Sequence, residues 1–175
     1  MHTHYIQFFT ATCTNWLPLL KSQDAKQIII ESLDYLVNKD RVKVFSFVIM
    51  PNHLHLIWKM ADNQERANVQ RDFLKYTGQQ LKFLLQKKSP QLLAACRVNL
   101  KDREYQFWKR NSLSIDLWSR EVVEQKLEYI HANPVSGKWN LVNEYTEYQY
   151  WSAAFYEDNQ NDFPFLTHYM ECFGG

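Results

Sequence analysis

VKVFSFVIMPNHLHLIWK, residues 42–59, carries the clearest structural pattern in the chain. Residues 42–49 are largely β-branched and aromatic on both faces, as expected of an interior strand that helices cover. Met50-Pro51-Asn52 then interrupts the run, because proline cannot donate to a strand ladder and Pro-Asn suits the middle of a tight turn. We therefore expect residues 53–59 to form a second strand that folds back antiparallel on the first.

The segments on either side alternate between strand and helix patterns. Residues rich in Thr, Phe and Ile indicate strands, and apolar residues at helical spacing indicate helices. Ser22 or Asp24 can cap the first helix, Ser119 can cap the last, and Pro134 ends the last. The expected order is strand 4–14, a helix after residue 22, strands 42–49 and 53–59, helix 67–87, a short strand at 106–109 and helix 119–133. This order is typical of a ferredoxin-like, or RRM-like, α+β sandwich with an antiparallel sheet and helices on one of its faces.

Length and composition indicate one ordinary globular domain over residues 1–175. At 21.1 kDa, with 46% hydrophobic and 22% charged residues, the chain can bury its own core and is not disordered, collagenous or coiled-coil. Apolar runs such as residues 45–50 are far shorter than the about 20 residues that cross a bilayer. The three cysteines are scattered and no signal-peptide pattern opens the chain, so we expect a soluble cytoplasmic protein without a zinc ribbon.

The net charge of +1 is a cancellation between two oppositely charged regions. Residues 59–110 contain twelve Lys and Arg against five Asp and Glu, whereas residues 140–175 contain six Asp and Glu and no Lys or Arg. A basic middle with an acidic, aromatic tail from about residue 140 is typical of a protein with one surface for a polyanion. Ordinary solvated helix faces explain the same counts equally well.

His53 and His55 are two residues apart on the second expected strand, so both project from one face and can present two imidazoles to one metal ion. The alternative is a pair of ordinary polar strand residues. The other residues expected on that face are Phe45, Phe47, Ile49 and Ile57. Because an unsatisfied pair of imidazoles is costly to bury in an apolar face, this setting favours a metal site.

Tyr129 and Asn133 are four residues apart and therefore lie one turn from each other on one face of the last helix. The apolar stripe of this helix lies about 100° around from the pair, which places both side chains at the edge of the buried face. Alternatively, Tyr129 lays its ring against the core and Asn133 caps the helix. His131 lies on the far side of the stripe, and we expect a structural role for it.

Two short motifs carry a resemblance to a known family. MPNHLHLIW at residues 50–58 resembles the His-hydrophobic-His (HUH) metal motif of single-tyrosine transposases. EYIHANPV at residues 128–135 resembles their catalytic-tyrosine helix, especially in the REP-associated tyrosine transposase (RAYT) branch. Tyr150-Trp151-Ser152 is similar to a further segment of that branch, and the similarity runs from about residue 5 to residue 156. The resemblance implies the α+β architecture of IS200-like transposases.

The resemblance also implies an enzyme that nicks and joins single-stranded DNA next to a hairpin. Tyr129 is then the nucleophile, and it forms a 5′-phosphotyrosine intermediate. His53 and His55 hold a divalent metal, Mg²⁺ or Mn²⁺. Asn133 stands where the insertion-sequence branch has a glutamine, and its amide, one methylene shorter, is the expected third ligand.

DNA contacts are expected from the basic helix and from a segment that follows it. The expected residues are Arg71, Lys75, Lys82, Lys109 and Arg110. The first three fall within about 40° of one another on one helix and are spaced for successive phosphates, and the other two extend this track. Two neighbouring aromatic residues, Phe107 and Trp108, either stack on unpaired bases or pack in the core.

Several alternatives stay open. The same fold suits a hairpin-binding regulator without turnover or a related HUH nickase, and a metal-dependent hydrolase unrelated to DNA is a third alternative. Relatives in the family include dimers that share tyrosine helices between subunits as well as monomers, so a homodimer remains an option. The acidic tail either covers the sheet or forms a subunit contact.

Overall fold

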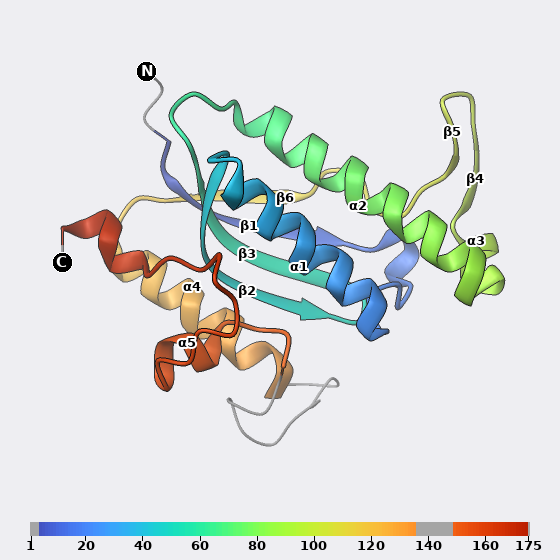
Figure 1. Cartoon of the computed structure of the whole chain (residues 1–175). Helices are drawn as coiled ribbons and strands as arrows, with labels where there is room; N and C mark the ends of the chain where they lie inside the picture. Colours follow the sequence, from blue (N-terminus) through green and yellow to red (C-terminus); the bar gives the residue numbers. More distant parts are fainter. Residues whose placement is uncertain (1–3, 136–148, 175) are drawn as a thin grey trace.

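The computed structural model describes residues 4–135 and 149–174. In chain order its elements are β1 (Ile6–Thr12), the 3-10 turn η1 (Thr14–Trp16), α1 (Gln23–Asn38), β2 (Val42–Met50), β3 (His53–Met60), α2 (Arg66–Lys88), α3 (Pro90–Ala95), β4 (Arg97–Leu100), β5 (Arg103–Tyr105), β6 (Leu113–Leu117), α4 (Arg120–Ala132), η2 (Asn133–Val135), α5 (Ala153–Glu157) and η3 (Tyr169–Phe173). Four strands form an antiparallel sheet in the order β2-β3-β1-β6, and β4 and β5 form a separate hairpin that projects beside α2 (Figure 1). The predicted α+β class with an antiparallel sheet is confirmed.

The turn at Pro51-Asn52 joins β2 to β3, as the sequence predicts. Met50 and His53 face each other as the last pair of the two strands. The Pro51 carbonyl accepts a hydrogen bond from the Leu20 N–H at 2.9 Å, and the Asn52 carbonyl accepts one from the Cys13 N–H at 2.8 Å. The turn is therefore tied to the chain that follows β1, which fixes the place where β3 begins.

Helices cover both faces of the sheet, whereas the sequence analysis expected them on one face. α1 and α2 pack on the face that carries Phe9, Leu54 and Trp58. α4 lies on the other face, because its buried stripe packs against a second apolar surface that includes Phe8 and Ile57 (Figure 1). Both faces of the central strands are apolar, so the sheet needs cover on both sides.

The fourth strand of the sheet is β6, which the sequence analysis missed. The sequence predicts a short strand at residues 106–109, but this segment forms only an isolated bridge between Trp108 and Cys13. Two backbone bonds flank the bridge, from the Lys109 N–H to the Thr12 carbonyl at 2.7 Å and from the Thr14 N–H to the Phe107 carbonyl at 2.8 Å. β6 alternates leucine or isoleucine with serine and aspartate, which is a strand pattern, although Leu117 is the buried one of its three apolar residues.

A β-bulge in β2 changes which of its side chains share a face with the histidines. Val44 pairs with Trp58 but Ser46 pairs with Ile57, so the alternation of side chains slips by one residue between them. Phe47 and Ile49 consequently lie in the core under α1 and α2, and not on the histidine face as expected. The apolar residues of β2 on the histidine face are Phe45, Val48 and Met50.

The C-terminal segment covers the open edge of β2 in the same chain. Trp151 forms an antiparallel bridge with Val48, Leu166 forms a parallel bridge with Val44, and the Thr167 N–H donates to the Val44 carbonyl at 2.9 Å. The first part of the expected acidic tail, residues 140–148, lies outside the described residues. Among the residues that the structure does describe, no helix is long and apolar enough to cross a membrane.

Candidate active site and nucleic-acid interface

His53 and His55 lie side by side at the start of β3, with their ring centroids 4.9 Å apart. The neighbours with which they alternate, Leu54 and Leu56, are fully buried under α1 and α2. The two imidazoles therefore project from the α4 face of the sheet, as strand alternation predicts. His53 is half-buried and His55 is 5% exposed.

Each imidazole is oriented by a hydrogen bond at its Nδ1 atom. The His53 Nδ1 donates to Asn52 Oδ1 at 2.7 Å, and the same Asn52 amide donates from Nδ2 to the Trp16 carbonyl at 3.5 Å. His55 Nδ1 and Thr10 Oγ1 are hydrogen-bonded at 2.8 Å, since Thr10 is directly opposite His55 in the pairing of β1 with β3. Such outer bonds fix ring orientation in metal sites and leave Nε2 as the coordinating atom.

The protonation state of His55 also suits a metal ligand. Burial, followed by the nearby charges of His53 and Lys126, lowers the pKa of His55 to about 3. The ring is therefore neutral at pH 7, and neutral imidazole is the form that binds metal ions.

Tyr129 reaches this pair from α4 within the same chain. Its ring centroid lies 5.4 Å from that of His55 and 5.9 Å from that of Phe8, and the residue is 52% exposed. α4 begins as predicted at Ser119, whose Oγ accepts from the Val122 N–H at 3.3 Å. The structure thus brings together a partly exposed phenol and two imidazoles that are 74 residues or more away in sequence.

Lys126 belongs to this site, and the sequence analysis missed it. Its Nζ lies 5.5 Å from the ring centroid of Tyr129 and 4.8 Å from that of Phe8. The signal was present in the sequence, because residues three apart on a helix are neighbours on its surface.

Asn133 ends α4 with helical backbone angles (φ −58°, ψ −49°), so it lies one turn beyond Tyr129 along the helix. Among the residues that the structure describes, no group of three or more His, Cys, Asp and Glu side chains could hold a metal ion. Two oriented imidazoles nevertheless fit one divalent cation, and an ion held there needs oxygen ligands from other groups.

His131 lies in the core instead of facing the histidine pair. Its Nε2 is 3.2 Å from Ser152 Oγ, its ring lies 5.9 Å from that of Trp151, and burial lowers its pKa to about 4. These contacts support the structural role expected for this residue.

A basic cavity of about 720 Å³ lies between α2 and the segment from β5 to β6. It brings together four of the five expected DNA-binding residues, Arg71, Lys75, Lys109 and Arg110, and adds Arg103, which the sequence analysis did not single out. Five cationic side chains thus face the cavity against one carboxylate, that of Asp102. The fifth expected residue, Lys82, lies over the ring of Tyr105, which lines the same cavity, at 5.4 Å.

The aromatic residues of this region have different roles. Trp108 is 8% exposed and its Nε1 donates to Thr77 Oγ1 at 3.0 Å. Of the two expected roles, base stacking and core packing, Trp108 therefore has the second. Phe107 and Tyr105 line the cavity with their rings stacked at 6.2 Å.

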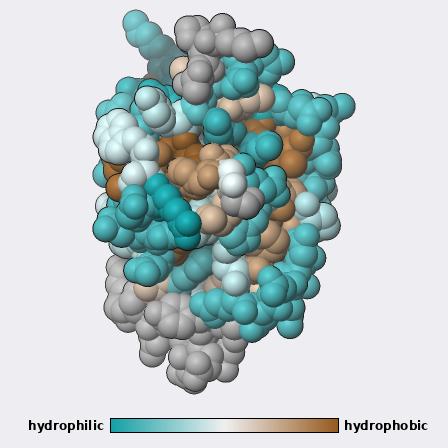
Figure 2. Space-filling model, turned by 90° about the vertical axis from the view of Figure 1, so that its left-hand side faces the viewer, coloured by the Kyte–Doolittle hydropathy of each residue, from teal (hydrophilic) through white to brown (hydrophobic). Residues whose placement is uncertain are grey.

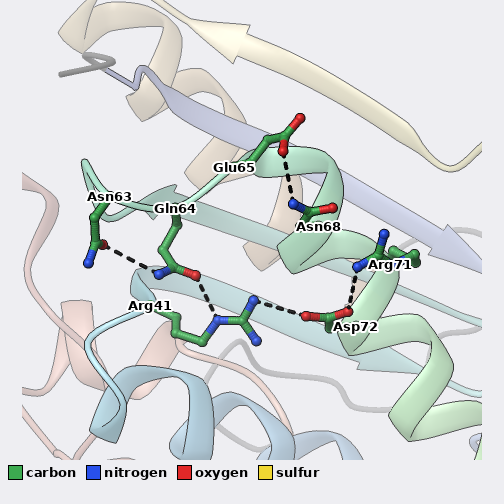
Figure 3. A network of polar contacts seen from close by, with 7 residues as sticks. All are labelled: Arg41, Asn63, Gln64, Glu65, Asn68, Arg71 and Asp72. Atoms are coloured by element: carbon green, nitrogen blue, oxygen red, sulfur yellow. Dashed lines mark hydrogen bonds and ion pairs between the residues drawn. The ribbon is translucent and has the colours of Figure 1, made fainter.

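Arg71 has one acidic neighbour, which it shares with a second arginine. Asp72 forms an ion pair with Arg41 at 3.0 Å and with Arg71 at 3.2 Å (Figure 3). The hydrogen bond from Arg41 is the largest of the effects that lower the pKa of Asp72. Because two guanidinium groups share one carboxylate, the Asp72 charge compensates only part of their positive charge. The Arg71 side chain is 66% exposed and is therefore accessible to an anionic ligand.

The cavity lies at the same end of the sheet as the histidine pair. The Lys109 N–H donates to the Thr12 carbonyl, and Thr12 is opposite His53 on the neighbouring strand. The backbones of Lys109 and His53 are therefore two strand spacings, or about 10 Å, apart. Lys109 thus lies near the histidine pair, whereas Arg71 and Lys75 lie on α2, which covers the opposite face of the sheet.

A second hollow, of about 900 Å³, has the opposite charge. It is lined by the carboxylates of Asp62, Glu65 and Asp116, with the guanidinium of Arg66. Figure 2 shows the side of the molecule on which the chain turns from β3 into α2; hydrophilic residues cover most of it, and hydrophobic residues show between them. An acidic hollow suits a polyanion less well than the basic cavity does.

The strand order and the helix arrangement define a fold found in transposases. A solved structure of a REP-associated tyrosine transposase bound to a REP hairpin shares it, with a TM-score of 0.63 and 18% identity, over 94% of this chain and 88% of that chain. A crystal structure of a transposase-like protein from Deinococcus radiodurans has a TM-score of 0.51 and 11% identity, over 74% of this chain and 91% of that chain. The predicted transposase fold is confirmed. No protein-family model and no curated protein matches the sequence.

Proposed function

We propose that this protein is a metal-dependent DNA nicking and joining enzyme of the single-tyrosine HUH kind, a transposase that acts on single-stranded DNA next to a hairpin. One observation carries the proposal: the Tyr129 ring lies 5.4 Å from that of His55, in the same chain. The two motifs lie far apart in the sequence, at residues 50–58 and 128–135, and the fold brings their side chains together.

Tyr129 is the proposed nucleophile. Its oxygen attacks the scissile phosphorus, a phosphotyrosine bond forms at the 5′ end, and the bond to the 3′ oxygen breaks to leave a free 3′-hydroxyl. A phenol is protonated at neutral pH and must lose its proton to attack. Lys126, beside the ring, stabilises the negative charge of the phenolate and of the attacked phosphate. The phosphotyrosine keeps the energy of the diester, so a DNA 3′-hydroxyl can reverse the step without ATP.

His53 and His55 are the proposed metal ligands, with the Asn133 amide oxygen as the third. Asn52 and Thr10 hold the two rings in place, and the neutral state of His55 keeps its lone pair ready for coordination. A bound Mg²⁺ or Mn²⁺ would supply a Lewis acid at a non-bridging oxygen of the scissile phosphate.

The basic cavity is the proposed DNA interface, since its cationic side chains are what a nucleic-acid backbone requires. Hairpin DNA is the proposed partner, which the hairpin bound to one structural neighbour supports. The cytoplasm is the proposed location of this activity. Because Tyr129 meets His55 within one chain, a monomer contains both groups, and the proposal does not require a homodimer.

Incubation of a labelled single-stranded hairpin library with the protein and Mn²⁺, followed by denaturing electrophoresis, tests the proposal. The wild type should give a covalent protein–DNA adduct that chelation of the metal prevents. Tyr129→Phe should give none, whereas Tyr35→Phe, a matched change of a 58% exposed tyrosine on α1, should behave as the wild type. Hairpin binding without an adduct would instead indicate the regulator considered above, and an adduct with Tyr129→Phe would exclude Tyr129 as the nucleophile.

A further inference from the structure

The turn η1 displays a tryptophan in an uncommon backbone conformation. Asn15 and Trp16 are consecutive non-glycine residues with positive φ, 49° and 58°. Bulky residues rarely adopt this left-handed region, and neighbouring structure must hold them there. The Trp16 N–H donates to the Cys13 carbonyl at 3.1 Å, and the Thr14 N–H donates to the Phe107 carbonyl at 2.8 Å.

This conformation leaves the Trp16 indole 62% exposed, although tryptophan is highly buried on average. The Lys109 Nζ lies 5.2 Å from the centroid of the ring. Lys109 also lines the basic cavity, so the indole stands directly beside a surface with five cations and one carboxylate. An aromatic face next to a cationic track is the combination by which proteins bind single-stranded nucleic acid, because the ring stacks on a base and the cations contact phosphates.

Trp16 is also connected to the candidate active site. Its carbonyl accepts from Asn52 Nδ2 at 3.5 Å, and Asn52 Oδ1 accepts from the His53 ring at 2.7 Å. One buried amide thus joins the backbone that carries the indole to an imidazole of the proposed metal site. A base stacked on Trp16 would lie at a set position relative to His53.

We propose that Trp16 and Lys109 form a subsite for one unpaired nucleotide, with the base stacked on the indole and the phosphate bound by the Lys109 ammonium group. This inference rests on the proposed function and deepens it, because it names where the unpaired strand passes between the basic cavity and the catalytic groups. The charge of the cavity selects a nucleic acid over an apolar peptide as the occupant.

Fluorescence anisotropy with two labelled DNA hairpins tests the subsite. Both hairpins have the same stem, but one is blunt and the other carries an unpaired extension. Trp16→Ala should weaken binding of the extended hairpin about 5- to 150-fold, which corresponds to the loss of one stacked base, and should leave the blunt hairpin nearly unaffected. Trp16→Phe should retain part of the affinity.

Trp118→Ala is the matched control. Trp118 is 71% exposed and packs edge-on against Tyr5 at the opposite end of the sheet, so its loss should change neither affinity. An equal loss for both hairpins on Trp16→Ala, or no loss at all, would overturn the subsite while leaving the proposed function intact. Failure of the wild type to bind either hairpin would overturn both.

Lys109→Gln provides a second readout that does not depend on the folding of the Trp16 variants. It should weaken binding of the extended hairpin more than that of the blunt one. It should also lower, by about 0.7, the steepness with which the logarithm of the binding constant for the extended hairpin falls with the logarithm of the salt concentration (the salt slope). Equal effects of Lys109→Gln on the two hairpins would contradict the subsite.

Discussion

Acid should destabilise the fold through His131, which is buried at the end of α4 beside Ser152 and two aromatic rings. Burial lowers the pKa of this histidine from 6.5 to about 4 in the folded protein. Between these two pH values the unfolded chain binds more protons than the folded one. The free energy of unfolding therefore falls as the pH falls through this window.

The size of the effect follows from the two pKa values. Between pH 7.5 and pH 5, a histidine with a pKa of about 4 when folded and 6.5 when unfolded lowers the free energy of unfolding by about 2 kcal/mol. His55, with a pKa of about 3, contributes a loss of similar size over the same range. Removal of the His131 imidazole should therefore remove about 2 kcal/mol of the acid sensitivity and leave the remainder.

Urea unfolding of the wild type and of His131→Asn at pH 7.5 and pH 5 measures this difference. Any loss of packing in the variant affects both pH values alike, so the measurement at pH 7.5 is the internal control. The difference in stability between the two proteins should change by about 2 kcal/mol between the two pH values. A difference that is the same at pH 7.5 and pH 5 would refute a buried, neutral His131.

Three further predictions concern the proposed site. Lys126→Met should lower the initial rate of covalent adduct formation about 100-fold, since it removes the cation beside the nucleophile; a rate within about twofold of the wild type would exclude this role. Thr10→Val should weaken Mn²⁺ binding about 10- to 100-fold in a calorimetric titration, because it removes the hydrogen bond that orients His55, and unchanged affinity would contradict that role. Replacement of both Arg71 and Lys75 by alanine should lower the salt slope of DNA binding by about 1.4 to 1.8 without loss of folding, and an unchanged slope would place the DNA elsewhere.

The parts of the site that could be predicted from the sequence depend on local geometry. Strand alternation after the turn at Pro51-Asn52 places His53 and His55 on one face whatever the rest of the chain does. In the same way, the helix period places Tyr129 at the edge of a buried stripe. The distance between the phenol and the imidazoles is not local, and only the resemblance to a known family gave reason to expect it.

The side of the sheet on which α4 packs could not be predicted from the same rules. Both faces of the central strands are apolar, so the spacing of apolar residues along α4 is compatible with packing on either face. The bulge between Val44 and Ser46 has no signature in an interior strand whose residues are nearly all buried, and it moved Phe47 and Ile49 away from the expected face. The alternation in β6 was readable, but its five residues form a short strand between segments that resemble loops.

The packing of α4 bears on whether Tyr129 acts in its own subunit. Its buried stripe, Val123, Leu127 and Ile130, is at most 7% exposed against the sheet and the segment around Trp151. Movement of α4 to a partner subunit would expose these side chains, at a cost of about 1.5–3 kcal/mol each, unless the partner's α4 replaced it in the same contacts. A monomer therefore holds Tyr129 beside its own His55, and sharing of tyrosine helices requires a symmetric exchange of the whole helix.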